Sequence, residues 1–599
     1  MPTFAARSLS VDAFPPDRPA RVVPGSPAAA RDARRVARWI AGGAMVAMLA
    51  AAPYRAFELD RFFVPKEIVL LLVAAGACWM TGTLLQDDGS DLGQRRGPAL
   101  ERLVDVALAA YLVGSVASAV LAPSGWLAAR ALAITGAGAG LFWAARAAAG
   151  RGAARPILGA LVAAVALAAA TALLQAYGVR SDYFSVNRAP GGTFGNRNFV
   201  AHLCAIGLPL AAYAALHVRR FVAALGAVLT ILALGAMLVL SRSRGAWIAG
   251  AVAGVPFAIG LLRAVVLARA QGAAGAPGRW RPRPGRVALL LLALGLGTAA
   301  AVSLPNALDW RSDSPYLDSV KGVVDYKGGS GRGRLEQWRN SVRLLAADPV
   351  LGVGPGNWSV RYPVVAPAGD PSLTEDRTTA NPWPSSDPVA VGSERGVLGL
   401  LALGLVAVGL LLTAHRAVWG AAAADVQAGR APDAAARALA GGALGGVLAA
   451  TLVAGAFDAV LLLAAPTIVV WPALGALSAL AADGGARSAG DGRRRGLARP
   501  AVARPAVARA GAGVLALGAA LAVGRAAAMP LYEEGGAAGV RLAARLAPGD
   551  YRVRLRAATL ALGRGDCADA RAHAEAAHTL APTAGAPRRV LAACARRGR

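Results

Sequence analysis

Long apolar runs alternate with short polar connectors along most of this chain. A helix needs about 20 apolar residues to cross a lipid bilayer, and unpaired backbone is not tolerated against lipid. The pattern therefore predicts an all-α fold, a polytopic helical membrane protein with about 13 transmembrane helices. The runs are Val36–Ala52, Lys66–Leu85, Leu103–Leu121, Trp126–Ala148, Ile157–Tyr177, Phe199–His217, Phe221–Leu240, Ala246–Ala268, Val287–Leu304, Gly396–His415, Ala438–Ala456, Leu461–Ala482 and Ala510–Ala528.

The longest polar stretch, Asn306–Glu394, lies between two of these runs. Within it, Arg332–Ala346 has the apolar spacing of a helix, and Leu351–Trp358 is a glycine-rich turn. Two shorter polar segments are its expected companions, Arg188–Phe199 and Ser241–Trp247. We expect the three pieces to face the same side of the membrane and to form one site.

Basic residues gather in every second connector, which sets an orientation. Membrane proteins retain Lys and Arg in cytoplasmic connectors. With the N-terminus in the cytoplasm, alternation places every strongly basic connector there: Arg95-Arg96, Arg146–Arg155, Arg219-Arg220, Arg263–Arg286 and Arg487–Arg509. The outer face then carries the C-terminus and the segments Tyr54–Pro65, Gly178–Asn198, Ser241–Gly245 and Asn306–Glu394.

The composition agrees with a membrane protein and changes how the charge is interpreted. Of 599 residues, 56% are hydrophobic and only 16% charged, whereas soluble chains carry about 25% charged residues. A net charge of +29 would suggest a nucleic-acid partner in a soluble protein. Here the arginines lie between apolar runs, and no basic face is interleaved with aromatic residues. Nucleic acid is therefore excluded as a partner.

Topology does not explain the arginines of the outer face. Arg188, Arg197, Arg242 and Arg244 all lie there, and charge at a membrane edge indicates function. The alternative is contact between interfacial arginines and lipid headgroups. Arg242 and Arg244 are separated by one serine and suit a pyrophosphate, because each guanidinium can hold two oxygens and never loses its charge.

Seven segments carry a resemblance to a known family. They are Asp60–Glu67, Gly192–Ala201, Leu240–Trp247, Arg334–Trp338, Asp348–Trp358, Ser393–Gly399 and Phe457–Leu463. In order and placement they resemble the O-antigen ligase and polymerase superfamily of bacterial polytopic glycosyltransferases. The resemblance implies an enzyme of the inner membrane that moves a glycan from an undecaprenyl-diphosphate carrier to a glycan, lipid (lipid A core) or protein acceptor. It implies transfer at the periplasmic face with no cofactor and no metal.

The same resemblance assigns residues to the donor. Arg244, together with Arg242, would bind the diphosphate, and Arg197 and Arg334 are further candidates for this role. Family members also carry a loop histidine, proposed to activate the acceptor hydroxyl. The large polar stretch of this chain has no histidine. Asp387 is the natural substitute as catalytic base and Glu394 is the other candidate, because an ionised carboxylate can accept a proton.

Alternatives of two classes stay open. Within the transferase class, the sequence does not separate an O-antigen ligase from a polymerase or from a transferase that glycosylates proteins. The other class is a non-catalytic protein that binds lipid-linked glycan as a scaffold and has lost its base. The retained Arg242 and Arg244 favour the enzyme, and the missing histidine favours the scaffold. The sequence has neither the His/Cys spacing nor the acidic cluster of a metal site.

The C-terminal region has a short repeat. Leu546-Ala547-Pro548 recurs as Leu580-Ala581-Pro582, an offset of 34 residues that is the period of the tetratricopeptide repeat. We expect this region to pack on the membrane helices or to bind a protein partner. Cys567 and Cys594 form either a disulfide or two free thiols.

The sequence thus predicts five regions. They are a disordered cytoplasmic tail at 1–35, N-terminal transmembrane helices at 36–305, a large periplasmic loop at 306–394, C-terminal transmembrane helices at 395–528 and a periplasmic tetratricopeptide-like module at 529–599.

Overall fold

A computed structural model describes most of the chain. The described residues are 27–86, 99–185, 187–218, 220–273, 280, 283–310, 312–322, 329–427, 431, 433–482 and 505–597. The predicted basic pair Arg95-Arg96, Arg219 and the segment 487–504 lie outside them. Within them the structure is helical, and the β pairing is one isolated bridge between Leu373 and Thr379.

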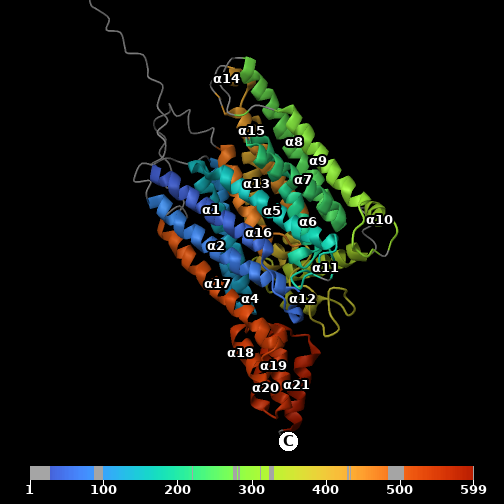
Figure 1. Cartoon of the computed structure of the whole chain (residues 1–599). Helices are drawn as coiled ribbons and strands as arrows, with labels where there is room; N and C mark the ends of the chain where they lie inside the picture. Colours follow the sequence, from blue (N-terminus) through green and yellow to red (C-terminus); the bar gives the residue numbers. More distant parts are fainter. Residues whose placement is uncertain are drawn as a thin grey trace, which may run out of the picture.

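The long helices form one bundle (Figure 1). They are α1 (Pro27–Leu49), α2 (Asp60–Gln86), α3 (Ala99–Val120), α4 (Gly125–Ala148), α5 (Ala154–Ala176), α6 (Arg197–His217), α7 (Phe221–Ser241), α8 (Arg244–Ala273), α9 (Pro284–Ser303), α13 (Asp387–Trp419), α15 (Ala434–Phe457), α16 (Ala464–Ala482) and α17 (Pro505–Glu533). A short helix, α14 (Ala423–Gln427), follows α13 at the upper end in Figure 1.

Eleven helices of the described residues are long and apolar enough to cross a membrane. One of these, Gly125–Ala176, spans 52 residues and bends at Gly152, whose φ is 90°, so that it comprises α4 and α5. α1 is not among the eleven, because arginines occupy its N-terminal half. When α1 is counted and the bent helix is divided, each of the thirteen predicted runs coincides with a helix. The prediction of an all-α, polytopic membrane protein is confirmed.

The first predicted boundary differs from the structure, and α13 and α17 also extend past the predicted ends at 394 and 528. α1 begins at Pro27, inside the region predicted to be a disordered tail. Ala29 and Ala33 are 1% and 0% exposed, so their side chains pack against the bundle and stabilise these first turns. The prediction of disorder is therefore corrected for residues 27–35, and residues 1–26 lie outside the described part.

Small residues let the central helices approach closely. In the most apolar window of α16, 94% of the residues are buried, against 22% for α9 and for α17, so α16 is central and the other two are peripheral. α8 and α15 meet at Gly260 and Gly442, where a Cβ built on Gly260 would lie 2.5 Å from the Gly442 Cα. Such glycine contacts are typical of helix pairs in membranes, where close backbone packing stabilises association.

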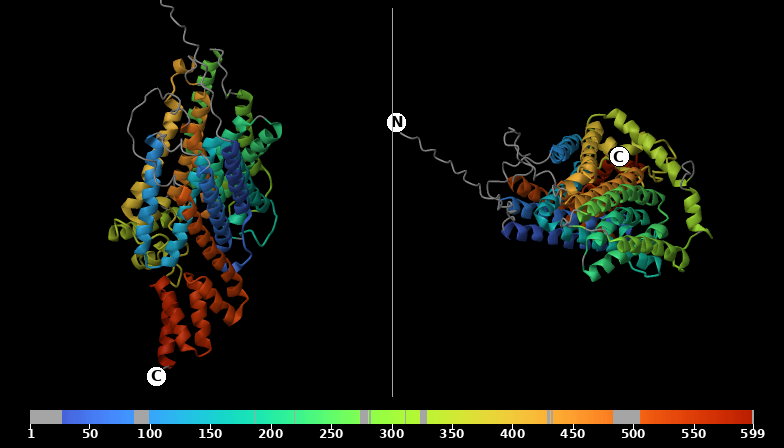
Figure 2. Two further views of the ribbon diagram at one scale, coloured as in Figure 1. Left: turned by 90° about the vertical axis from the view of Figure 1, so that its left-hand side faces the viewer. Right: turned by 90° about the horizontal axis from the view of Figure 1, so that it is seen from above.

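The polar stretch contributes three helices: α10 (Pro315–Lys321), α11 (Gly329–Ala347) and α12 (Trp358–Val365). Figures 1 and 2 show α11 and α12 close to the end of the bundle from which the C-terminal helices project, opposite to α14. The large loop and the C-terminal region thus share one end of the molecule. Which compartment this end faces stays a prediction.

Four helices make up the C-terminal region, which we call the tail: α18 (Gly536–Leu546), α19 (Tyr551–Gly563), α20 (Cys567–Leu580) and α21 (Gly585–Arg597). The repeated Leu-Ala-Pro triplets lie at the ends of α18 and α20, at equivalent places in two helix pairs. The tetratricopeptide assignment and a protein partner stay predictions. Cys567 and Cys594 are both free.

Candidate active site

A cavity of about 450 Å³ opens where the three predicted segments meet. We call it the arginine cavity. It is lined by Arg188, Asn196, Arg197, Asn198, His202, Arg242, Ser243, Arg244, Gly245, Asp318, Ser319, Arg334 and Phe457. All four arginines predicted to bind the diphosphate therefore line one cavity: Arg197, Arg242, Arg244 and Arg334. Their role in binding diphosphate stays a prediction.

The N-terminal ends of α6 and α8 position these side chains. Asn196 caps α6 by accepting a 3.0 Å hydrogen bond from the backbone N–H of Asn198, so the first turn of α6 faces the cavity. Arg242 ends α7 with a φ of 53°, and α8 begins two residues later at Arg244. Helix N-termini carry unpaired N–H groups and a positive partial charge, which favours bound anions.

Aromatic stacking and hydrogen bonds hold the arginines in place. The guanidinium carbons of Arg197 and Arg242 lie 5.1 Å and 4.8 Å from the centre of the same ring, that of Trp310. Arg242 Nε donates to Ser319 Oγ at 2.8 Å. Arg244 donates through Nη1 to the carbonyl oxygen of Gly322. These contacts fix the side chains and leave further N–H donors of each fork available.

The cavity is strongly positive. Five arginines line it against one carboxylate, that of Asp318. Arg334 Nη2 lies 4.0 Å from Asp458. No carboxylate of the described residues forms an ion pair with Arg197, Arg242 or Arg244. Unpaired guanidinium groups in a partly closed space attract an anion with several oxygens, such as a diphosphate.

His202 also lines the arginine cavity, and the sequence prediction missed it. Its side chain is 2% exposed, and Nδ1 has no hydrogen-bond partner in the described part of the chain. In the sequence this histidine lies inside the predicted span Phe199–His217. The sequence did contain a signal for this position. Asn198 and His202 are four residues apart, and residues at this spacing share one face of a helix. The imidazole therefore lies one turn further along α6 than Asn198 and lines the same cavity as the arginines.

Asp387 lies elsewhere. It does not line the arginine cavity, and it is 3% exposed at the start of α13. Its Oδ1 accepts the N–H of Val460 at 3.0 Å, and its Oδ2 accepts the N–H of Leu461 at 2.9 Å. Both oxygens thus hold the turn between α15 and α16, and this geometry favours a structural role. The predicted base role of Asp387 gains no geometric support.

Glu394 is likewise buried away from the arginine cavity, at 2% exposure. Its Oε2 accepts from Arg395 Nη1 at 3.2 Å, and its Oε1 accepts from the N–H of Trp358 at 3.4 Å. The Glu394 carbonyl accepts from Gly354 N–H at 3.0 Å. These contacts dock the glycine-rich turn onto α13. The turn therefore serves packing, and Glu394 is better explained as its anchor than as a base.

The described residues contain no group of three or more His, Cys, Asp or Glu arranged to hold a metal ion. The residues of the arginine cavity are instead suited to binding an anion directly.

Comparison with known proteins bears on the same region. The family model described as O-antigen ligase matches residues 227–404, from within α7 to within α13. The matched region contains Arg242, Arg244 and Arg334, whereas Arg197 and His202 precede it. A search of curated proteins gave no match. The O-antigen ligase domain at residues 227–404 therefore supports the place of this multi-pass membrane protein in the O-antigen ligase superfamily.

Proposed function

We propose that the protein transfers a glycan from a polyprenyl (undecaprenyl) diphosphate to an acceptor hydroxyl, as an O-antigen ligase-type glycosyltransferase. The observation that carries the proposal is the meeting of Arg197, Arg242, Arg244 and Arg334 in one cavity. A neutral scaffold surface would not require several unpaired guanidinium groups, which repel one another when no anion is bound. The outer, periplasmic face of the inner membrane is the proposed location.

The reaction needs little from the protein beyond placement and charge. The acceptor oxygen forms a bond to the anomeric carbon of the glycan, and the bond from that carbon to the diphosphate oxygen breaks. The electron pair leaves with the diphosphate. Guanidinium groups that already contact the diphosphate stabilise the charge that develops on the leaving oxygen, which lowers the barrier.

We propose that His202, rather than Asp387 or Glu394, is the base that takes the proton from the acceptor hydroxyl. A neutral imidazole accepts a proton readily near neutral pH. The imidazolium that results lies beside the departing diphosphate and near Asp458, and both are negative. Because His202 lines the same cavity as the arginines, a base from α6 replaces the histidine that the large loop lacks.

The test is surface glycan from cells that carry Arg242→Ala, Arg244→Ala or His202→Gln as their only copy. We expect each arginine variant to lower glycan transfer about tenfold or more, since a charge-assisted hydrogen bond contributes about 1.5–3 kcal/mol. His202→Gln should abolish transfer and leave binding of inorganic pyrophosphate by the purified protein intact. Arg269→Ala is the matched control, because Arg269 is exposed further along α8.

The glycan that accumulates in the inactive variants distinguishes a ligase from a polymerase. Lipid-linked polymer that accumulates without attachment indicates a ligase, and single-repeat glycans indicate a polymerase. Normal glycan in all three variants, with normal amounts of protein in the membrane, would contradict the enzyme and leave the scaffold.

A further inference from the structure

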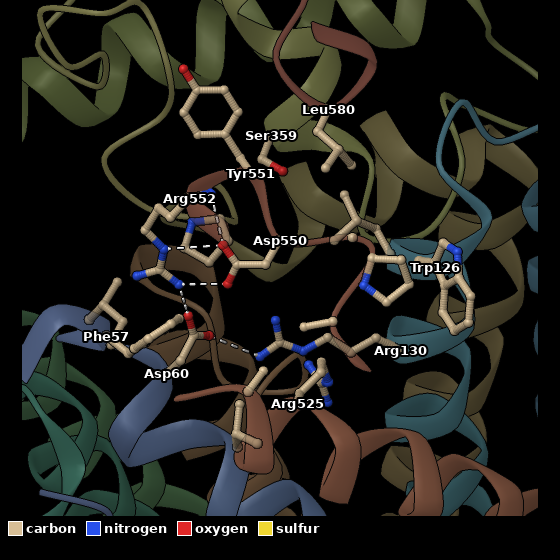
Figure 3. A pocket seen from close by; sticks show the side chains of 18 of the residues that line it. Phe57, Asp60, Trp126, Arg130, Ser359, Arg525, Asp550, Tyr551, Arg552 and Leu580 are labelled. Carbon is tan, nitrogen blue, oxygen red and sulfur yellow. Dashed lines mark hydrogen bonds and ion pairs between the residues drawn. The ribbon is translucent and has the colours of Figure 1, made fainter. Parts of the chain in front are cut away.

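A second cavity, of about 520 Å³, lies between the membrane helices and the tail (Figure 3). We call it the tail cavity. The ends of α2, α4 and α17 form its floor, segment 374–382 of the large loop forms one wall, and the turn from α18 to α19 forms another. The O-antigen ligase match includes the wall formed by segment 374–382, but it does not extend to α2, α4, α17 or the tail.

The charges of the tail cavity are paired with one another. Asp60 forms ion pairs with Arg552 and, at 3.7 Å, with Arg130. Asp550 lies 3.0 Å from Arg552. Glu67, further along α2, pairs with Arg130 at 2.5 Å and with Arg525. Three arginines thus pair with three carboxylates. The carboxylate of Glu58 also lines the cavity, outside these pairs, so four carboxylates face three arginines and the net charge is −1.

The paired arginines and the excess of carboxylate distinguish the tail cavity from the positive arginine cavity. Although burial alone lowers the pKa of Arg552, the charges of Asp550 and Asp60 raise it above its ordinary value, so the ion pairs persist across the physiological range. A diphosphate would gain little here, because each guanidinium already has a carboxylate partner. The tail cavity instead offers polar groups of both signs held in ion pairs, and Nη1 of Arg525 is left without a hydrogen-bond partner among the described residues. Such a lining suits a neutral ligand rich in hydroxyl groups.

An aromatic wall faces the charged groups. Figure 3 shows Trp126 on the opposite side of the cavity from Asp60 and Arg552. The Trp126 side chain is 51% exposed although it lines a cavity. Gly549 packs against it from the tail, where an added Cβ would lie 3.0 Å from Trp126 Cβ. The tail thus packs against the base of the Trp126 side chain, and about half of this residue stays exposed.

Hydroxyl groups complete the lining. Ser359, Thr374, Thr378 and Thr379 all contribute to it. A sugar ring has apolar C–H faces and polar hydroxyl edges. An exposed aromatic ring opposite hydroxyl and paired charged groups matches both surfaces of such a ring.

We propose that the tail cavity binds the saccharide chain of the acceptor, a neutral oligosaccharide. The inference rests on the proposed glycan transfer. The two cavities are joined by one loop, because the segment that lines the tail cavity continues to Ser385. The Ser385 N–H donates to Gln337 at 2.7 Å, and Trp338 Nε1 donates to the Ser385 carbonyl at 3.3 Å. Gln337 and Trp338 lie on α11, which also carries Arg334 of the arginine cavity.

Binding to the purified full-length protein tests the proposal with two probes. One is the phosphate-free saccharide released by mild acid from the surface glycan of the same cells, which contains both core and polymer. The other is inorganic pyrophosphate. We expect Trp126→Ala to weaken saccharide binding about tenfold and to leave pyrophosphate binding unchanged. Trp126→Phe should lie in between, because it keeps a smaller aromatic face.

Matched variants separate the two proposals. Trp419 is 53% exposed on α13 and does not line the tail cavity, so Trp419→Ala should bind both probes normally. Arg244→Ala should lose pyrophosphate and keep the saccharide. Saccharide binding that is absent from the wild type, or equal in Trp126→Ala and Trp419→Ala, overturns the tail cavity as a glycan site. Unchanged pyrophosphate binding in Arg244→Ala would overturn the donor site alone.

Discussion

The hydroxyl of Tyr551 donates a 2.7 Å hydrogen bond to the carboxylate of Asp376, which joins the tail to the large polar loop. The other oxygen of Asp376 accepts the backbone N–H groups of Gly585 and Ala586, each at 3.1 Å. Burial raises the pKa of Tyr551, and the bond to Asp376 raises it further. One loop carboxylate therefore binds the starts of both α19 and α21, and the tail in turn fixes the loop that walls the tail cavity.

Removing this carboxylate should loosen the loop. Asp376→Ala leaves two N–H groups at the start of α21 without their acceptor, a loss of about 0.5–2 kcal/mol for a helix cap. We expect hydrogen exchange of segment 374–382 and of the first turn of α21 to rise about threefold to thirtyfold. Mass spectrometry of the exchanged full-length protein measures both segments.

Glu375→Ala is the neighbouring control, since Glu375 is exposed. Equal exchange in the two variants would show that the Asp376 contacts do not hold the loop.

Trp310 should control the affinity of the arginine cavity, because both Arg197 and Arg242 stack on its ring. A cation over an aromatic face contributes about 0.5–2 kcal/mol. Trp310→Ala frees two guanidinium groups, and we expect pyrophosphate to bind about threefold to tenfold more weakly. Trp310→Phe keeps a ring face and should restore most of the affinity. Titration calorimetry measures both, and an unchanged affinity in Trp310→Ala would exclude a positioning role.

The apolar pattern was sufficient to predict the bundle and part of the site. Each predicted run overlaps a helix, because a long apolar segment satisfies its backbone hydrogen bonds as a helix in the bilayer. The alternation of spans also placed the segments of Arg197, Arg242 and Arg334 on one face, and they line one cavity. The resemblance drawn from the same segments agrees with the family match at residues 227–404.

Contacts between distant segments could not be predicted in this way. The sequence position of Asp387 predicts a catalytic base. In the structure its oxygens instead accept hydrogen bonds from the N–H groups of Val460 and Leu461, more than seventy residues away. His202 was hidden because an apolar run does not show which of its faces lines a cavity. The tail cavity depends on the pairing of Asp60 with Arg552, and no local pattern links an N-terminal helix to the tail.

Asp387→Asn tests whether that carboxylate is structural. The asparagine amide has one acceptor oxygen, so it can accept only one of the two backbone N–H groups. Its NH₂ group then faces the other N–H, donor against donor. Leaving a buried donor unsatisfied costs about 1–3 kcal/mol. We expect a lower unfolding temperature in detergent and normal glycan transfer per folded molecule. Asp313→Asn, on an exposed segment, should change neither quantity. Full stability with complete loss of transfer would restore Asp387 as the base.

Gly396 should be intolerant of a side chain, whereas Gly404 on the same helix should not. Gly396 has φ 66° and ψ −168°, a region that is essentially limited to glycine. A Cβ there would lie 2.2 Å from the Val350 carbonyl oxygen. Gly396→Ala should destabilise the protein by about 1–3 kcal/mol or more. A Cβ on Gly404 meets nothing within 4 Å, so Gly404→Ala should be neutral or slightly stabilising. Thermal unfolding of both variants measures the difference.

The stability of the tail should depend on pH through His573. Burial lowers the pKa of His573, Asp569 opposes this shift, and the positive Arg554 adds to it. The ordinary histidine pKa is about 6.5, so the unfolded tail binds a proton more readily than the folded tail does. Stability is therefore full above about pH 6.5 and falls as the pH drops below that value.

Cys594 reports this opening, because its side chain is 0% exposed in the folded tail. In a Cys567→Ala background, we expect alkylation of Cys594 at pH 5.5 to be faster in the wild-type sequence than in His573→Gln. At pH 7.5 the two rates should be similar. Comparison at one pH cancels the change in thiolate fraction, which is common to both proteins. A rate ratio that stays constant between pH 7.5 and pH 5.5 would show that His573 does not couple the tail to pH.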